Sequence, residues 1–395
     1  MPRLSNRIST LNDGGSDGWE VFLKARRMAE AGEPVIELTI GEHDIRTDPE
    51  ILRAMAEAAA GGHTGYSAIP GTDALRDAVA ARIAARSGVA TSRANVLITP
   101  GGQAALFAAH MAACDPGDTA LFIDPHYATY PGTLRAVGAR PRAIATDPAR
   151  AFLPDPQRIA EAAQETGAAS LLINTPNNPS GAIYPRATLE GIAQAAEAAD
   201  LWLISDEVYD TQIWEGAHLS PRALPGMAAR TLVIGSMSKS HAMTGSRIGW
   251  VAGPEEAIAR LYDLSVNTTY GVPGYIQDAA LFALRQGTPL ETRIAEPFRR
   301  RRALAQQILA QQNSVGLVPS GGAMYLFLDI RATGLSGESF AHALLDERRI
   351  AVMPGESFGA SAAGFVRVAM TVPDADFAAA LETLCAFAET RAVAA

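Results

Sequence analysis

The middle of the chain alternates short apolar runs with alanine-rich stretches whose apolar positions follow a helical period. Five of these runs predict buried strands, at residues 96–99, 120–124, 170–174, 201–206 and 232–235. The helices expected between them cover residues 102–113, 129–137, 156–166 and 187–199. Short, wholly apolar strands that alternate with helices indicate a mostly parallel sheet covered by helices on both faces. The predicted fold class is therefore α/β.

The two ends of the chain have a mixed pattern that differs from this regular alternation. Residues 19–31 are helical in pattern, and residues 35–40 alternate as a strand. Beyond the central region we expect long helices up to about residue 312, then strands within 318–329, 350–358 and 365–370, and a closing helix over 374–390. The pattern predicts an N-terminal arm and small-domain part over residues 1–45, a large domain over 46–285 and a small α+β domain over 286–395.

The residues that follow the five strands are suited to binding a ligand. In open parallel sheets, ligands bind at the carboxyl ends of the strands. Taken singly, each residue has an ordinary explanation, since glycine pairs and asparagine are frequent in turns. We expect the set to converge on one end of the sheet, and its members are Gly102, Gln103, Tyr127, Asn178, Asp206, Tyr209 and Lys239.

The stretch from Ser236 to Trp250 carries the most specific chemistry. Lys239 lies between two predicted strands, and a desolvated lysine suits Schiff-base chemistry. Ser236, Ser238 and the guanidinium of Arg247 are suitable partners for a phosphate. Alone, the stretch also fits an ordinary surface lysine in a serine-rich loop. Together with the strand ends, it predicts pyridoxal 5′-phosphate as the cofactor.

Each group of that cofactor has a predicted partner among these residues. The amino end of the helix at Gly102 and Gln103 would join the serines and Arg247 around the phosphate. Asp206 would keep the pyridine nitrogen protonated, and Tyr127 would stack on the ring. The phenolic oxygen would accept hydrogen bonds from Asn178 and Tyr209. Lys239, once freed by a substrate amine, would act as general base and acid in a ping-pong amino transfer to a 2-oxo acid.

Composition excludes several other classes of protein. The chain has 395 residues and a net charge of −9, which argues against nucleic acid or an anionic membrane as partner. The seven histidines are scattered, so no metal site is predicted, and the start lacks the apolar core of a signal peptide. Cys114 and Cys385 are expected to be buried thiols in a reducing cytoplasm. The basic run 299–302 is expected to be a solvated helix face.

Several motifs, in this order along the chain, resemble the class I/II aminotransferases, whose members have the type I fold of pyridoxal-phosphate enzymes. The resemblance extends from about Ile36 to the C-terminus. The motifs are Leu38-Thr-Ile-Gly-Glu, Gly65-Tyr66 with Gly71 and Leu75-Arg76, Thr99-Pro-Gly-Gly-Gln, Asn174-Thr-Pro-Asn-Asn-Pro-Ser-Gly, Ser205-Asp-Glu-Val-Tyr, and Ser236-Met-Ser-Lys with Gly245-Ser-Arg-Ile-Gly.

The resemblance implies further site residues and a partner. Arg367 matches the arginine that grips the substrate α-carboxylate, and Gly41 and Asn178 are implied near the same carboxylate. Tyr66 matches a tyrosine that reaches the cofactor phosphate of the neighbouring subunit. The resemblance therefore implies a homodimer with shared active sites, acting on an L-amino acid and a 2-oxo acid.

The identity of the substrate stays open at this point. Stretches around His241, Pro221 and Gln277 are similar to members of the family that use arginine and pyruvate, although other basic, aromatic and small neutral donors remain candidates. His43 and Ser246 depart from the usual family pattern. An arginine side chain would need a carboxylate, and the candidates are Asp13, Asp17 and Glu42.

Two alternative functions compete with amino transfer. A lyase or oxidase on the same fold would keep the same cofactor residues, and only its products would differ. A regulator that uses this fold to bind an effector would need a DNA-binding domain. The roughly 35 residues before the first strand hold no helix-turn-helix, so this alternative is disfavoured.

Overall fold

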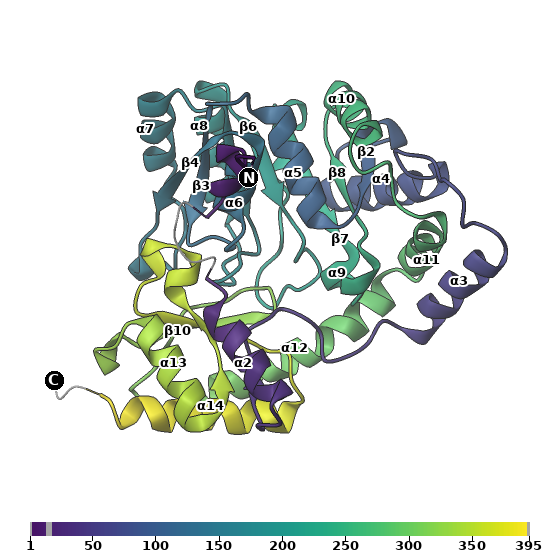
Figure 1. Cartoon of the computed structure of the whole chain (residues 1–395). Helices are drawn as coiled ribbons and strands as arrows, with labels where there is room; N and C mark the ends of the chain where they lie inside the picture. The colour runs from purple at the N-terminus through teal and green to yellow at the C-terminus, as the bar shows by residue number, and fades with distance from the viewer. Residues whose placement is uncertain (1, 13–17, 393–395) are drawn as a thin grey trace.

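The computed structural model describes residues 2–12 and 18–392, and its centre is a seven-stranded sheet (Figure 1). The strand order within these residues is β2-β8-β7-β6-β5-β3-β4, and only β8 runs antiparallel to its neighbours. The mostly parallel sheet that the sequence predicted is confirmed. The strands are β2 (Val96–Thr99), β3 (Thr119–Asp124), β4 (Arg140–Ala145), β5 (Ser170–Asn174), β6 (Trp202–Asp206), β7 (Thr231–Ser236) and β8 (Gly249–Ala252).

Helices cover both faces of this sheet because its strands are apolar on both sides. Leu97 and Phe122 point to one face, whereas Ile98 and Leu121 point to the other. The first face is covered by α5 (Gly102–Ala113), α6 (Tyr130–Val137) and α10 (Glu255–Val266). The second face is covered by α7 (Pro156–Thr166), α8 (Arg186–Ala198), α3 (Pro49–Ala60), α4 (Asp73–Ser87) and α11 (Gly274–Arg285).

Two strands differ from the sequence prediction. The edge strand β4 was not predicted, because most of its side chains are at least partly exposed and its sequence lacks an apolar run. The strand expected over residues 35–40 is reduced to β1 (Ile36–Glu37), which pairs in parallel with β11 (Ile350–Ala351). The remainder of that segment leaves the sheet and turns toward the cavity described below.

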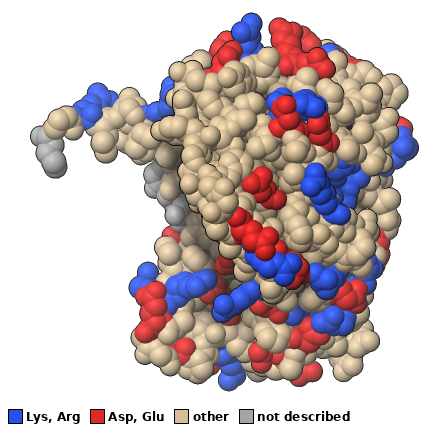
Figure 2. Space-filling model, turned by 90° about the vertical axis from the view of Figure 1, so that its right-hand side faces the viewer, with Lys and Arg blue, Asp and Glu red and all other residues tan. Residues whose placement is uncertain are grey.

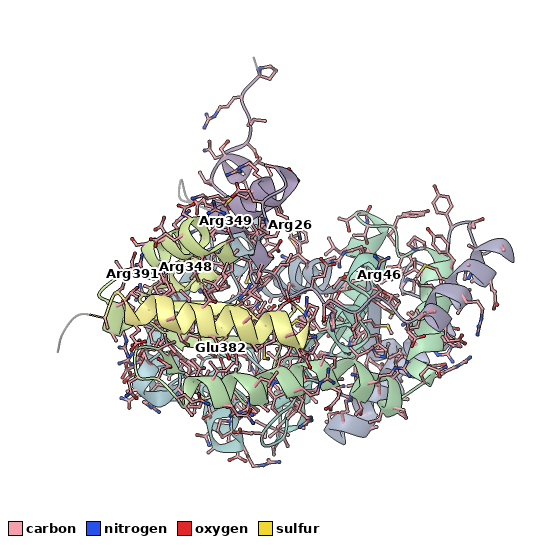
Figure 3. All side chains as sticks on the ribbon, turned by 90° about the horizontal axis from the view of Figure 1, so that it is seen from below. Arg26, Arg46, Arg348, Arg349, Glu382 and Arg391 are labelled. Atoms are coloured by element: carbon pink, nitrogen blue, oxygen red, sulfur yellow. The ribbon has the colours of Figure 1, made fainter. Side chains whose placement is uncertain are left out.

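The C-terminal part of the chain forms a second, smaller sheet of order β12-β13-β10-β9. Helix α14 lies beside α12 across one side of this layer, and Figure 3 shows the two helices running side by side. Just beyond the C-terminal end of α14, Arg391, which is labelled in Figure 3, pairs with Glu347 of α13 at 2.5 Å. The C-terminal elements are β9 (Gly316–Leu317), β10 (Tyr325–Asp329), β12 (Met353–Pro354), β13 (Phe365–Ala369), α12 (Thr288–Leu309), α13 (Gly337–Arg348) and α14 (Asp374–Glu389). The N-terminal segment contributes α1 (Asn6–Ser9) and α2 (Glu20–Glu30).

The basic run on α12 is only partly solvated, which corrects the sequence prediction. Arg301 is 3% exposed and donates to Asp44 at 2.6 Å and to Asp374 at 2.8 Å. Arg302 is largely buried and donates to the carbonyl of Ser320 at 3.0 Å. Only Arg299 and Arg300 fit the solvated face. The sequence pattern missed this because the carboxylates that pair with Arg301 come from distant segments.

Charges of both signs are interspersed on the visible surface (Figure 2). That face has no continuous basic stripe of the kind that nucleic-acid binding needs. Within the described ranges, no helix combines the length and the apolar character that crossing a bilayer requires. Cys114 and Cys385 are both buried and free, as predicted.

Candidate active site

A cavity of about 270 Å³ lies at the carboxyl ends of β2, β3, β5, β6 and β7. The convergence expected from the strand ends is therefore confirmed as geometry. All the predicted cofactor and substrate residues except Tyr66 line it: Gly41, Gly102, Gln103, Tyr127, Asn178, Asp206, Tyr209, Ser236, Ser238, Lys239, Arg247 and Arg367.

Lys239 reaches the cavity from α9 (Met237–Ser240), a single turn that follows β7 directly. Ser236 caps this turn, because its hydroxyl accepts a hydrogen bond from the N–H of Ser238 at 3.1 Å. The ammonium group of Lys239 donates to the carbonyl oxygen of Gly41. Burial lowers the pKa of Lys239, because it disfavours the charged amine. The direction of this shift is toward the neutral, nucleophilic amine.

Asp206 ends β6 and is buried against a phenol that the sequence analysis missed. The hydroxyl of Tyr130 donates to Asp206 Oδ2 at 2.7 Å, and the N–H of Val208 donates to Oδ1 at 3.3 Å. Burial raises the pKa of Asp206 to about 6, although the hydrogen bond from Tyr130 acts in the opposite direction. Tyr130 could have been found from the sequence, because it lies three residues after Tyr127 and within the helix expected over residues 129–137.

Arg247 lies against the amino end of α5. Its Nη1 donates to the carbonyl of Thr244 at 2.8 Å. No side chain caps α5, so its first N–H groups remain available to a ligand. A Cβ on Gly101 would lie 2.8 Å from Arg247 Cζ, so only glycine allows this close approach. The guanidinium, the helix terminus and the serine hydroxyls form a cluster of donors suited to an anion.

Arg367 occupies the middle of β13 and is fully buried between two aromatic rings. Its guanidinium lies 4.2 Å from the ring centroid of Tyr325 and 4.5 Å from that of Phe358. Nη1 donates to Asn178 Oδ1 at 2.8 Å, and Nη2 donates to the carbonyl of Thr39. Burial lowers the pKa of Arg367 while leaving it a cation. A buried, oriented fork of this kind suits a carboxylate.

Asn178 and Tyr209 have partners that the sequence did not predict. Besides binding Arg367, Asn178 donates its backbone N–H to Asn174 Oδ1 at 2.7 Å. The hydroxyl of Tyr209 lies 3.0 Å from that of Tyr325. Asn174 could have been found from its place at the end of a predicted strand, whereas Tyr325 had no such signal. The other lining residues missed are Trp19, Ile40, Leu106, Val208 and Thr244.

Two residues singled out in the sequence lie outside this cavity. Tyr66 is 92% exposed, and its ring makes an edge contact with Tyr270 at 5.2 Å between centroids. His43 is buried against the ring of Phe298, and neither of its ring nitrogens has a hydrogen-bond partner among the described residues. Of the acidic candidates for a substrate side chain, Glu42 lines the cavity, whereas Asp13 and Asp17 lie outside the described residues.

Comparison with known sequences places this chain in a recognised family of enzymes. The family model for aminotransferase class I and II matches residues 33–384. The arginine–pyruvate transaminase AruH of Pseudomonas aeruginosa is 38% identical over 370 residues, which are 94% of each chain. The aspartate/prephenate aminotransferase of Thermus thermophilus is 33% identical, with 97% of this chain and 98% of that one covered.

Solved structures have the same fold. Aspartate aminotransferase from Thermus thermophilus with maleate superposes with a TM-score of 0.91 at 32% identity, covering 98% of this chain and 100% of that one. Aromatic aminotransferase from Pyrococcus horikoshii gives a TM-score of 0.86 at 30% identity, covering 93% and 99%. The similar proteins therefore share the architecture over nearly their whole length while differing in the substrates that they are named for.

Proposed function

Because the chain belongs to the class I and II aminotransferase family, we propose that it transfers the amino group of a basic L-amino acid, arginine first, to a 2-oxo acid such as pyruvate. Its cofactor is pyridoxal 5′-phosphate, as in the family. The observation that carries the proposal is one cavity that brings together a buried amine, a buried carboxylate and two arginines. These are the groups that pyridoxal phosphate and an amino acid substrate require for binding.

The residues present fit the phosphate end of the cofactor. The free N–H groups at Gly102 and Gln103, the hydroxyls of Ser236 and Ser238 and the guanidinium of Arg247 all face the cavity. A dianion held by N–H groups and an arginine gains strong, charge-assisted hydrogen bonds. We assign the phosphate to this cluster.

The ring and the aldehyde have matching groups at the other end of the cavity. The carboxylate of Asp206 can accept a hydrogen bond from the protonated pyridine nitrogen, and Tyr127 can cover the ring face. Asn178 and Tyr209 are assigned to the phenolic oxygen. Bound pyridoxal phosphate supplies an aldehyde and an electron-withdrawing ring. Lys239 provides the amine for that aldehyde and, when released, moves a proton at the substrate α-carbon.

Arg367 is assigned to the substrate α-carboxylate. Its two terminal nitrogens donate to Asn178 Oδ1 and to the carbonyl of Thr39. A carboxylate can take over or share these donors and forms two charge-assisted bonds. The adjacent carbonyl of Gly41 accepts from Lys239. The segment 39–41 therefore links the proposed carboxylate grip to the proposed catalytic amine.

The charges around the cavity favour a cationic side chain over a second carboxylate. Among the described lining residues the cations are Lys239, Arg247 and Arg367, and each already has an assignment. Glu42 also lines this cavity, and its carboxylate accepts a hydrogen bond from Thr244 Oγ1 at 3.0 Å. Together with the 38% identity to an arginine–pyruvate transaminase, this supports arginine ahead of aspartate.

We also propose that the chain acts as a homodimer with shared sites. A second cavity of about 920 Å³ lies between the N-terminal segment, α5, α6, α10 and the C-terminal layer. The N-terminal arm extends away from the body in Figures 2 and 3, and its apolar residues Leu4 and Ile8 are exposed. Exposed apolar groups beside a large groove favour a partner surface. Tyr66 would reach the cofactor phosphate of that partner.

A half-reaction experiment tests the proposed donor. The visible absorbance band of the protein with bound cofactor should bleach on addition of L-arginine and return on addition of pyruvate. L-Aspartate at the same concentration should bleach it far more slowly. A band that bleaches with aspartate and not with arginine would overturn the proposed substrate. Release of ammonia without formation of a new amino acid would favour the lyase or oxidase alternative.

A further inference from the structure

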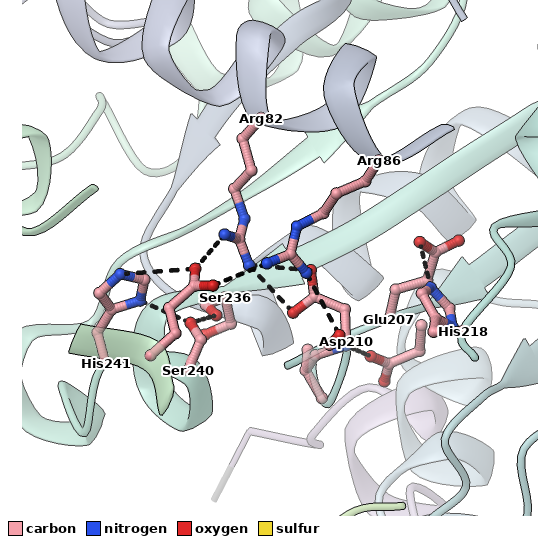
Figure 4. Close-up of polar contacts among 11 residues, drawn as sticks. Arg82, Arg86, Glu207, Asp210, His218, Ser236, Ser240 and His241 are labelled. Atoms are coloured by element: carbon pink, nitrogen blue, oxygen red, sulfur yellow. Dashed lines mark hydrogen bonds and ion pairs between the residues drawn. The ribbon is translucent and has the colours of Figure 1, made fainter. Parts of the chain in front are cut away.

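Four charged side chains form a closed network between α4, α12 and the turn after β6, and Figure 4 labels three of them, Arg82, Arg86 and Asp210. Arg82 donates to Asp210 at 3.0 Å and also pairs with Glu291. Arg86 lies one helical turn later and pairs with Asp210 at 2.7 Å and with Glu291 at 2.8 Å. Each carboxylate is therefore bound by both arginines.

Three of the four side chains are largely buried, whereas that of Arg86 is 36% exposed. The side chain of Glu291 is 6% exposed, that of Arg82 is 13% exposed and that of Asp210 is 17% exposed. Burying such ions costs several kcal/mol each, so a buried network is weak evidence for net stabilisation. What it provides is a fixed geometry between the three elements that contribute to it.

Both carboxylates lie close to segments that carry residues of the candidate active site. Asp210 follows Tyr209 in the chain, so its two arginines hold the turn that carries the phenol. Glu291 Oε1 lies 4.0 Å from His241 Nε2. His241 Nδ1 lies 2.7 Å from Ser240 Oγ, and that hydroxyl donates to the carbonyl of Ser236 at 3.3 Å. These contacts span α9, the turn that carries Lys239.

The ring of His241 is completely buried and faces charged groups of both signs. Burial lowers the pKa of His241 to about 3, and the neighbouring Arg82 acts in the same direction. Glu291, Asp210 and Arg86 also face it, so the balance of charge on this side depends on the intact network. Because the Ser240 hydroxyl donates to Ser236, the neutral imidazole donates from Nδ1 to Ser240 Oγ, and its Nε2 packs 4.0 Å from Glu291 Oε1 without a hydrogen bond. The ring therefore fills the space between α9 and Glu291 without adding a positive charge near Lys239.

We propose that Glu291 and His241 are positioning residues for Lys239. They hold the turn α9 against α4 and α12, so that the amine stays in its buried place beside Gly41. The inference rests on the role proposed above for Lys239, and it assigns no contact between Glu291 and cofactor or substrate. When the network is broken, the turn loosens and water reaches Lys239, whose pKa then rises toward the ordinary lysine value.

The reactivity of Lys239 can be measured separately, because Lys24 and Lys239 are the two lysines of the chain. In apoprotein treated with acetic anhydride over a range of pH, mass spectrometry of the peptides gives the labelling midpoint of each amine. Lys24, which pairs with Asp346 on the surface, is the internal reference. The affinity of the apoprotein for pyridoxal phosphate is measured in parallel.

The test compares Glu291→Gln with the control Asp374→Asn. Asp374 also pairs with two arginines of α12, Arg300 and Arg301, but it lies in the C-terminal layer and does not line the cavity. We expect Glu291→Gln to raise the Lys239 midpoint by about one pH unit and to weaken cofactor binding roughly tenfold. Lys24 should not change, and Asp374→Asn should leave both Lys239 readouts unchanged.

The possible outcomes separate the inference from the proposed function. If Glu291→Gln lowers the melting temperature but leaves the Lys239 midpoint and the cofactor affinity unchanged, the network is merely structural and the inference is overturned. If Glu291→Gln does not fold, His241→Asn carries the same test, because asparagine keeps a partner for Ser240 and loses the group facing Glu291. If cofactor does not attach to Lys239 even in the unsubstituted chain, the proposed function fails instead.

Discussion

At the scale of single residues, the candidate site depends on burying groups that are normally solvated. Burial lowers the pKa of Lys239 and raises that of Asp206, so each is shifted toward its neutral form before any ligand arrives. Such shifts cluster at functional sites because catalysis needs groups that are poised to change charge. Arg367 is equally buried but stays charged, and it is held between aromatic rings.

Replacing Arg367 by lysine should weaken every amino acid donor. Lysine keeps the charge but loses the planar fork and its stacking on Tyr325. We expect kcat/KM to fall roughly 10- to 100-fold, as for the loss of one charge-assisted hydrogen bond. Steady-state kinetics with saturating cofactor provide the measurement. Arg331→Lys is the matched control, since Arg331 stacks on Phe365 at the surface, and a similar loss there would contradict the assignment.

The carboxyl of Asp206 should make the stability of the apoprotein depend on pH. Its pKa of about 6 lies above the ordinary value of an unfolded aspartate, so the folded state holds this proton more tightly. The stabilisation is complete below about pH 4 and is lost as the pH rises through 6. Asp206→Asn apoprotein should therefore be more stable than the parent at pH 7, by up to about 3 kcal/mol, and equal to it near pH 4. Urea unfolding at both pH values measures this difference, and a gain that is independent of pH would contradict the account.

At the scale of elements, the sequence was most informative where structure and chemistry coincide. The five predicted strands are present, and the side chains that follow them line one cavity. These strands and side chains could be predicted because apolar strands and turn residues are local features of the sequence. Tyr325 and Tyr130 were missed because their roles come from contacts between distant segments. The same limit explains Arg301, whose partners Asp44 and Asp374 are far away in the chain.

The segment that leaves β1 should tolerate no side chain at Gly41. A Cβ there would overlap the hydroxyl of Tyr325 and lie 2.7 Å from its Cζ. Gly41→Ala should displace Tyr325 or the segment itself, cost about 1–3 kcal/mol and raise KM for the donor. Thermal unfolding and kinetics together measure both effects. Gly245→Ala is the control, because a Cβ at that position meets nothing within 4 Å. Equal behaviour of the two variants would refute the steric argument.

At the scale of the whole molecule, the described residues of one chain surround a large groove and expose an aromatic pair. The groove of about 920 Å³ and the extended N-terminal arm lie on the side that we assign to a second copy. Tyr66 and Tyr270 are exposed and contact one another by their edges. The proposed shared site gives Tyr66 a function that its own chain does not provide.

Shared sites can be tested by mixing two defective variants. Lys239→Ala lacks the amine, and Tyr66→Ala should bind cofactor weakly. In a mixed dimer, one site carries both defects, whereas the other combines an intact Lys239 with an intact Tyr66 from its partner. Co-refolding should therefore restore tight cofactor binding at about half of the sites in the mixed dimers. A chain that sediments as a monomer, or mixtures with no restored binding, would disprove the shared site.

The most direct test of the central claim is to locate the covalent attachment of the cofactor. The protein with bound pyridoxal phosphate is reduced with borohydride, digested and analysed by mass spectrometry. Only the peptide that contains Lys239 should gain the mass of the reduced cofactor, and prior conversion with L-arginine should abolish the label. Attachment to Lys24, or no attachment to either lysine, would contradict the assignment of Lys239 and the function built on it.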